Sequence, residues 1–357
     1  MTHYRLIRRA ALAGVLALPI LTTGCGLFSQ PASKSIDPPQ NSAQNVNADA
    51  TDNGQTVAQG DQATQGDQSQ MTLYLKDRNG LLAPISVIAG LGTDEKPGQK
   101  ALEMMVDGGT YANEIPDGFQ AVLPEGTVIK GLNIVPDQKL AIVDFSKEFG
   151  NYKAEDERSI VEAITWTLTS LQGVNKVEIT LEGQRLTEMP VNGLPMDDDL
   201  TRAIGINLEA ADNVDYSLST PVTIYFSALT PDDVQYFVPV TRLVNRSDNK
   251  AKTAIEQLIS GPINNLPLKA VMTSDVLVKN VTKKDGIVTV DLQDDSYQAG
   301  QPEPAEMMDA LVLSLTEVTG MSKVQVKLNG KTDFVDTQNR KYTEPVTRME
   351  HLNAFKS

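Results

Sequence analysis

Few side chains in this 357-residue chain could take part in nucleophilic or metal-assisted chemistry. The chain has one cysteine, Cys25, and two histidines, His3 and His351. A structural zinc site needs about four Cys or His ligands, and Ser-His-Asp or Cys-His catalysis needs an imidazole beside the nucleophile. The sequence therefore predicts no metal site, no cofactor and no catalytic residue of these kinds.

Carboxylates are plentiful, and Asp144 and Asp291 could be tested as a glycosidase pair. They occupy the same position in two similar segments, each at the end of an expected strand. Equivalent positions in two separate domains seldom meet in one cleft, so a role in capping a turn is favoured over catalysis. The acidic run Asp197, Asp198 and Asp199 lacks the spaced ligands and the glycine of a calcium loop, and we expect a solvated loop.

The charge and composition of the chain limit its partners. The formal net charge is -15, and aromatic residues make up 5% of the chain. Binding to a nucleic-acid backbone depends on clustered Lys and Arg, so we expect no nucleic-acid partner.

Residues 1–24 predict an export signal that is removed from the mature protein. Arginines at positions 5, 8 and 9 precede an apolar run of about 12 residues, which is too short to span a membrane. The sequence Thr22-Thr-Gly-Cys25 then resembles a bacterial lipobox, so we expect lipid attachment at Cys25. The alternative is a cleaved signal with an incidental cysteine. Processing leaves 28 basic and 46 acidic side chains, a mature net charge of -18.

Residues 25–70 predict a lipid-anchored, disordered tether. From residue 29 onward this stretch has no aromatic residue and few large aliphatic ones, so burial cannot offset its ordering entropy. A flexible coil of this length would reach roughly 35–40 Å from the membrane. Within it, Asp37-Pro38-Pro39-Gln40 is either a docking peptide or a stiff spacer, and the spacer is favoured.

The rest of the chain contains one long internal repeat. Residues 162–183 align without a gap to residues 309–330, an offset of 147, and shorter matches lie upstream. Eight aligned positions are identical: Ala163/Ala310, Leu168/Leu315, Thr169/Thr316, Gly173/Gly320, Lys176/Lys323, Val177/Val324, Leu181/Leu328 and Gly183/Gly330. The period is too long for a solenoid, so we expect two tandem domains, residues 71–209 and 221–357.

Hydrophobic periodicity predicts the same elements in both copies. One helix in each carries a single apolar stripe, and alternating apolar residues around it indicate strands. The order is β-β-α-β-β-α-β, an α+β domain with its helices on one face of a small sheet. The strands with the clearest signals are expected over 128–135, 140–145, 177–181, 277–282, 287–292 and 324–328.

Trp166 falls opposite the apolar stripe of its helix, and Val312 and Leu313 lie on the equivalent face in the second copy. Large apolar groups on an outer face need a cover, which could be a partner protein or the other domain. The inter-domain cover is favoured because tandem copies joined by a short linker tend to pack together.

The two copies differ in charge. Residues 71–209 hold 12 basic and 22 acidic side chains, net -10, whereas residues 221–357 hold 15 and 17, net -2. This difference could orient the protein in an assembly by electrostatic steering, or be a solvated acidic face.

The start Cys25-Gly-Leu-Phe, the segment Asp37-Pro-Pro-Gln40 and the repeated Val143-Asp-Phe-Ser146 and Val290-Asp-Leu292 carry a resemblance. The chain resembles the sporulation and germination lipoproteins of endospore-forming bacteria whose repeated unit is the GerMN domain. The resemblance implies a non-enzymatic protein, anchored by lipid to the outer forespore membrane and facing the intermembrane space. It implies that the partners are channel proteins of a transenvelope complex between mother cell and forespore. GerMN domains are similar to ring-building modules, which leaves self-association open.

Two other functions remain as alternatives. One is a protein that binds or hydrolyses the peptidoglycan of the spore cortex. The other is the solute-binding lipoprotein of a transporter, but such a protein would alternate β and α elements through two lobes. Here each copy completes itself, which favours an assembly protein.

Overall fold

The computed structural model describes residues 68–91, 96–196, 198–263 and 267–355, which belong to one compact unit. The expected signal peptide, Cys25, the segment Asp37-Pro38-Pro39-Gln40 and Asp197 lie outside the described residues. Among the described helices, none has both the length and the apolar character needed to cross a bilayer.

The series of elements that the sequence predicts occurs twice along the chain; each copy adds a short last strand, and the first also has the short strand β3. The first domain contains β1 (Gln68–Asp77), β2 (Leu82–Gly90), α1 (Pro97–Met104), β3 (Phe119–Gln120), β4 (Ile129–Val135), β5 (Leu140–Phe145), α2 (Glu157–Leu168), β6 (Lys176–Leu181) and β7 (Gln184–Arg185). After the short β8 (Glu209–Ala210), the second contains β9 (Ser219–Leu229), β10 (Gln235–Asn245), α3 (Lys250–Ser260), β11 (Leu277–Lys284), β12 (Ile287–Gln293), α4 (Ala305–Thr319), β13 (Lys323–Leu328) and β14 (Val346–Thr347). The α+β class and the duplication are therefore confirmed.

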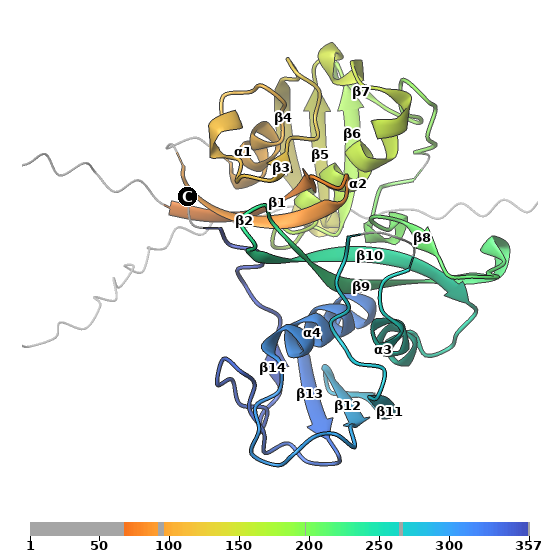
Figure 1. The fold of residues 1–357 in the computed structure, drawn as a ribbon. Coiled ribbons are helices and arrows are strands. Elements are labelled where there is room, and N and C mark those ends of the chain that lie inside the picture. The colour runs from red at the N-terminus through yellow and green to blue at the C-terminus, as the bar shows by residue number, and fades with distance from the viewer. Residues whose placement is uncertain (1–67, 92–95, 197, 264–266, 356–357) are drawn as a thin grey trace, which may run out of the picture. The chain divides into compact units, whose positions relative to one another are not determined.

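The strands of each domain divide between two sheets, where the sequence suggested one. In the first domain, β2-β1-β3 form one sheet and β4-β5-β6-β7 form the other, with β5 and β6 parallel. In the second domain, β8-β10-β9 and β11-β12-β13-β14 repeat this division. Figure 1 shows the helices of each domain lying between its long hairpin and its four-stranded sheet.

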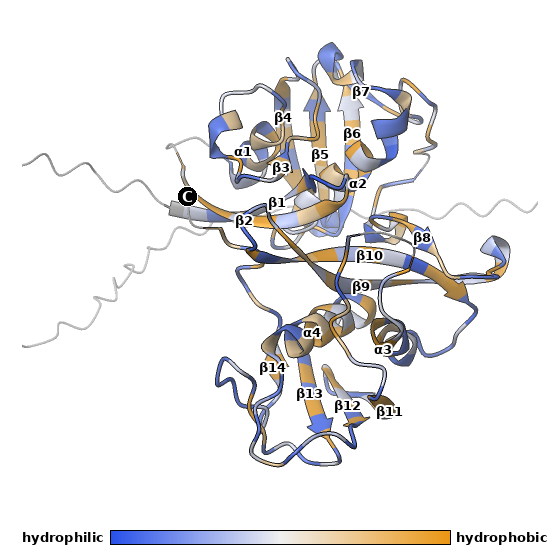
Figure 2. Cartoon of the chain, viewed as in Figure 1, coloured by the Kyte–Doolittle hydropathy of each residue, from blue (hydrophilic) through white to orange (hydrophobic). Residues whose placement is uncertain are grey.

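Each helix layer is therefore covered on both faces. The apolar stripe of α2 packs toward the four-stranded sheet, because Leu168 and Leu171 meet Leu132 of β4 around Gly98. On its other face, Thr167 accepts a hydrogen bond from the backbone N–H of Tyr74 in β1, at 3.0 Å. Ser314 of α4 accepts the equivalent bond from Tyr225 in β9, at 2.9 Å. Figure 2 shows the apolar colour on the long strands and on α4, with polar residues on much of the outer loops.

Turn residues behave largely as their types predict. Asp285 and Gly286 connect β11 to β12 and both have positive φ, as a tight hairpin turn requires. Gly320 ends α4 in the left-handed conformation, whereas Gly173, also left-handed, lies five residues beyond the end of α2. β1 begins at Gln68, three residues before the expected start of the first domain.

The two long hairpins lie against each other where the domains meet. β2 and β10 are in contact, and β8, at the end of the expected first domain, pairs with β10 in parallel. An aromatic cluster joins Phe119 of β3, Tyr236 of β10 and Phe355 beyond the last strand, with ring centroids 5.1–6.5 Å apart. The Tyr236 hydroxyl donates a hydrogen bond to Asp77 of the first domain at 2.7 Å. The domains therefore share a polar and apolar interface.

Candidate functional site

Each four-stranded sheet is followed by a short arm that leads to the interface between the domains. The first arm is residues 200–207 and the second arm is residues 346–353. At an offset of 146 both read Thr-Arg, three variable residues, an aliphatic residue and Asn. Asn207 and Asn353 both have a left-handed backbone, with φ values of 47° and 53°. This conformation is tolerated best by Gly and Asn, so the asparagines suit their positions.

The first arm ends by joining the two hairpins through the side chain of Asn207. Its Oδ1 accepts a hydrogen bond from the N–H of Leu82 at 2.8 Å, and its Nδ2 donates to the carbonyl of Leu82 at 2.8 Å. The same Nδ2 donates to the carbonyl of Pro239 in β10 at 2.7 Å. The Asn207 side chain thus bonds to the edge of β2 as a neighbouring strand would, and it also bonds to β10.

The second arm makes the equivalent contacts through Asn353. Asn353 Oδ1 accepts from the N–H of Phe237 at 2.8 Å, and Nδ2 donates to the carbonyls of Phe237 and of Pro84, both at 2.8 Å. The strand registers place Pro84 opposite Tyr74 and Pro239 opposite Tyr225, so these two prolines are equivalent. Each asparagine side chain therefore bonds to the hairpin of its own domain and to the equivalent proline in the hairpin of the other domain.

The residues just before the asparagines cross between the domains as well. In the first arm, Ile206 accepts a hydrogen bond from the N–H of Thr241 at 2.8 Å and donates its own N–H to the Thr241 hydroxyl at 2.9 Å. In the second arm, the Leu352 carbonyl accepts from the N–H of Ser86 at 3.2 Å. The two domains are thus related by an approximate two-fold axis, and each arm binds the hairpin of the other domain.

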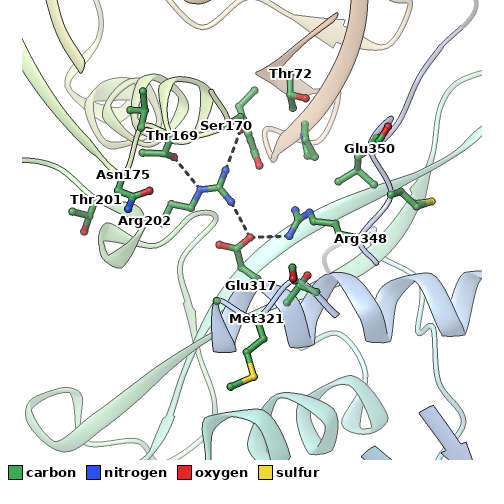
Figure 3. Close-up of a pocket in the computed structure, with 18 of the residues that line it drawn as sticks. Thr72, Thr169, Ser170, Asn175, Thr201, Arg202, Glu317, Met321, Arg348 and Glu350 are labelled. Atoms are coloured by element: carbon green, nitrogen blue, oxygen red, sulfur yellow. Dashed lines mark hydrogen bonds and ion pairs between the residues drawn. The ribbon is translucent and has the colours of Figure 1, made fainter. Parts of the chain in front are cut away.

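A group of charged residues lies at this axis, and Figure 3 shows two arginines converging on one carboxylate. Arg202 and Arg348 come from the same position of the two arms. Each donates to Glu317 Oε2, Arg202 at 2.9 Å and Arg348 at 3.0 Å. We call these three residues the axial cluster.

Hydroxyl groups and rings complete the surroundings of the two guanidinium groups. Arg202 also donates to the hydroxyls of Thr169 at 2.9 Å and Ser170 at 3.0 Å, and its guanidinium carbon lies 4.4 Å from the centre of the Trp166 ring. Arg348 also donates to the Tyr225 hydroxyl at 2.6 Å. Every nitrogen of the Arg202 guanidinium group and both terminal nitrogens of the Arg348 group therefore already donate to groups of the protein.

The environment of the axial cluster shifts several pKa values. Burial opposes ionisation of Glu317, but the charges of Arg202 and Arg348 outweigh it, so the pKa of Glu317 is lowered. Burial raises the pKa of both Tyr74 and Tyr225, and the nearby guanidinium groups oppose this only in part. The cluster is therefore two cations around one anion, with neutral tyrosines beside it.

A cavity of about 750 Å³ opens beside the axial cluster. It lies at the carboxyl ends of α2 and α4, and its charged lining residues are Arg202, Arg348, Glu317 and Glu350. The two positive charges are matched by two negative ones, and helix carboxyl ends add partial negative charge. The cavity therefore has no marked preference for an anion or a cation. No group of three or more Cys, His, Asp or Glu side chains in the described part of the chain is placed to hold a metal ion.

The three apolar residues that the sequence placed on an outer helix face are buried. Trp166, Val312 and Leu313 have exposed fractions of 0%, 2% and 0%. The Trp166 indole donates to the carbonyl of Gly205 at 2.8 Å, and its ring meets that of Tyr74 edge-on at 5.6 Å. This corrects their placement on an outer face, because the hairpin of each domain covers the helices. The inter-domain link at Trp166 is indirect, through Arg202.

The acidic residues considered above as catalytic groups or calcium ligands form turn-capping hydrogen bonds and a surface ion pair. Asp144 accepts from the N–H of Gly183 at 2.8 Å, and Asp291 accepts from the N–H of Gly330 at 3.0 Å. These are equivalent bonds in separate domains, as expected for a turn-capping role. Asp199 pairs with Arg185 at 3.1 Å, on the surface.

The arms and the axial cluster are the residues that sequence reasoning missed. A signal was present, since the Thr-Arg and Asn positions recur at 201, 202 and 207 and at 347, 348 and 353. The pattern is short, and its offset of 146 differs by one from the offset of the long repeat. Nothing in its composition distinguishes it from a surface loop.

The fold and this interface define a class: proteins of two tandem α+β domains that hold each other through reciprocal arms. A family model described as "Germane: Sporulation and spore germination" matches residues 72–187 and 223–334, more than half of the chain. A relative named spore germination protein GerM, from Bacillus subtilis (strain 168), is 38% identical over 96% of both chains. The solved tandem GerMN domains of the sporulation protein GerM from Bacillus subtilis match with a TM-score of 0.75 at 38% identity, covering 80% of this chain and all of that one. The chain therefore belongs to the Germane family of sporulation and spore germination proteins.

Proposed function

We propose that this protein is a lipid-anchored, non-enzymatic assembly protein of the sporulating cell's envelope. Membership of the family gives a role in sporulation or germination. The finer role is our own inference: Cys25 anchors the chain to the outer forespore membrane, and the tandem domains in the intermembrane space bind channel proteins of a transenvelope complex.

The observation that carries this proposal is the reciprocal joining of the domains. Each arm binds the hairpin of the other domain, and the amide groups of Asn207 and Asn353 bond to both hairpins. Two domains held in this way keep a fixed relative orientation, which suits a protein that positions partners. A catalytic protein would need reactive groups in a cleft, whereas the cavity between these domains is lined by side chains that bond to one another.

The lipid anchor can be tested with Cys25→Ala in a sporulating host that lacks the wild-type gene. The variant removes the thiol that would be acylated, so we expect the protein to leave the membrane fraction and heat-resistant spores to fall about tenfold or more. Cys25→Ala fused to a transmembrane helix should restore both properties. Normal spore counts with the soluble variant would contradict an anchored role.

The assembly role can be tested separately from the anchor. We expect the tagged wild-type protein to co-purify from sporulating cells with proteins of the channel between mother cell and forespore. Purified protein incubated with spore-cortex peptidoglycan should release no fragments. Release of muropeptides would support the alternative of a cortex hydrolase and contradict the proposal.

A further inference from the structure

The approximate two-fold axis relates most residues in and around the axial cluster to a counterpart in the other domain. Arg202 corresponds to Arg348, and Tyr74 corresponds to Tyr225. The exception is the carboxylate. Position 170 of the first domain aligns with position 317 of the second, and holds Ser170 instead of a glutamate. The interface is symmetric in shape and asymmetric in charge.

Because of this asymmetry, the net charge at the axis depends on which two domains pair. A first domain against a second places one carboxylate between two guanidinium groups, as observed. A first domain against another first domain would bring two guanidinium groups together with two serines and no carboxylate. Two like charges at short range in a partly buried site are strongly unfavourable.

We propose that the face between the domains is a self-complementary docking surface for a domain of this same kind, and that Glu317 is the residue that decides which domains it accepts. The face of the first domain binds a partner domain that supplies an acid at the position of Glu317. The partner that it fits is the second domain of the same chain, and it disfavours the first domain of another chain. This inference does not rest on the proposed function.

The geometry allows the carboxylate to be moved to the other side of the axis. Ser170 already accepts a hydrogen bond from Arg202 at 3.0 Å, so a longer acidic side chain at this position starts beside that guanidinium group. Ser170 also lines the cavity of about 750 Å³, which gives the side chain room. By the two-fold relation, a glutamate at position 170 would reach Arg202 and Arg348 as Glu317 now does.

The test uses the full chain with a protease site inserted between Asp212 and Asn213, which are exposed in the linker between the domains. Cleavage after folding leaves the two halves joined only by the interface. Gel filtration with light scattering over a dilution series then measures their association. Circular dichroism of the uncut chains shows separately whether each variant folds.

Four variants are compared with the wild type. Glu317→Ser should weaken association of the cut halves about tenfold to 100-fold, because it leaves two facing cations without an anion. Ser170→Glu with Glu317→Ser should restore association to within about threefold of the wild type. Ser170→Glu alone should bind at least as tightly as the wild type. Glu256→Ser removes an exposed acid of α3, whose pair with Lys252 is 3.6 Å long, and should change nothing.

Failure of the double variant to recover while both uncut chains remain folded would overturn the proposal. It would show that a carboxylate on the other side of the axis does not replace Glu317. Equal association of the wild type and Glu317→Ser would overturn it as well. If Glu317 only stabilised its own helix, the double variant would not recover association.

Discussion

Asn207 and Asn353 carry a large share of the polar contact between the domains. A left-handed backbone at each position turns the side-chain amide toward a hairpin edge, where it meets one N–H and two carbonyl groups. Those backbone groups lie at the edges of β2 and β10. Without the side-chain amides, these backbone groups would lose their hydrogen-bond partners in a site that is partly closed to water, and this loss lowers the stability of the folded protein.

Replacement of Asn207 by Ala should therefore lower the free energy of unfolding by about 1–3 kcal/mol. Urea unfolding followed by circular dichroism measures the change. Asn213→Ala is the matched control, because Asn213 is also left-handed, with φ of 58°, but is exposed in the linker. An equal loss in both variants would assign the effect to backbone strain and not to the lost hydrogen bonds.

Glu317 should make stability depend on pH in a defined direction. Its pKa is lowered in the folded protein because the charges of Arg202 and Arg348 outweigh the effect of burial. A lowered pKa gives stability that is fully present above the ordinary pKa of glutamate, about 4.3, and is lost as the pH falls through the lower, folded value.

We expect the difference in unfolding free energy between wild type and Glu317→Gln to be constant near neutral pH and to shrink as the pH falls below about 4.3. The difference is needed because burial raises the pKa of other acids, including Glu162 and Glu209, which contribute with the opposite sign. Urea unfolding at a series of pH values measures it. A difference that grows on acidification would contradict the assigned direction.

Arg242 joins two elements of the second domain to β8 at the end of the first. It lies on β10, is completely buried, and pairs with Glu209 of β8 at 2.7 Å. It also donates to the Gln257 side chain and to the Gly261 carbonyl at the end of α3, both at 3.0 Å. The guanidinium group thus connects a strand contributed from the end of the first domain to the helix layer of the second.

Arg242→Met should destabilise the protein by about 3–5 kcal/mol, because Glu209 would be left buried without its cation. Adding Glu209→Leu should recover part of this loss, since two apolar groups can replace a buried ion pair at little cost. Thermal unfolding of the single and double variants forms the test. Additive losses would mean that the two residues act independently.

The elements with strong periodicity were predictable from the sequence, and the way they stack was not. The strands at 140–145 and 287–293 carry a strong apolar pattern, and Asp285-Gly286 marks the hairpin that joins β11 to β12. The outer face of α2, however, carries Glu162, Thr165 and Trp166, a mixture that suggested an exposed face. The first arm supplies partners for two of these side chains, because the carbonyl of Gly205 accepts from Trp166 and the N–H of Asn207 donates to Glu162, and such contacts leave no periodic signal.

The candidate site was harder to predict for a related reason. Trp166 was identified as unusual and does border the axial cluster, through the guanidinium group of Arg202. The arginines and asparagines of the arms lie in irregular segments, where hydrophobic periodicity says nothing. Their partners are up to 269 residues away in the chain, as for Asn353 and Pro84, so only the folded structure brings them together.

At the scale of the whole molecule, the shared interface should couple the unfolding of the two domains. We expect calorimetry of the chain from residue 68 onward to show a single cooperative transition, because each domain supplies polar partners for the other. The double variant Asn207→Ala with Asn353→Ala should split this into two transitions. Two transitions in the wild type would show that the arms do not couple the domains.

The second arm also has a consequence for how the protein is made. A chain is synthesised from its N-terminus, so the hairpin of the first domain appears long before Asn353, the residue that binds Pro84. Until the second arm exists, the part of the hairpin edge at Pro84 and Ser86 is unpaired, although Asn207 already binds the edge at Leu82. Closing the edge therefore depends on synthesis of the second arm, and a chain interrupted before position 353 keeps an unpaired stretch of strand edge, which favours aggregation and degradation.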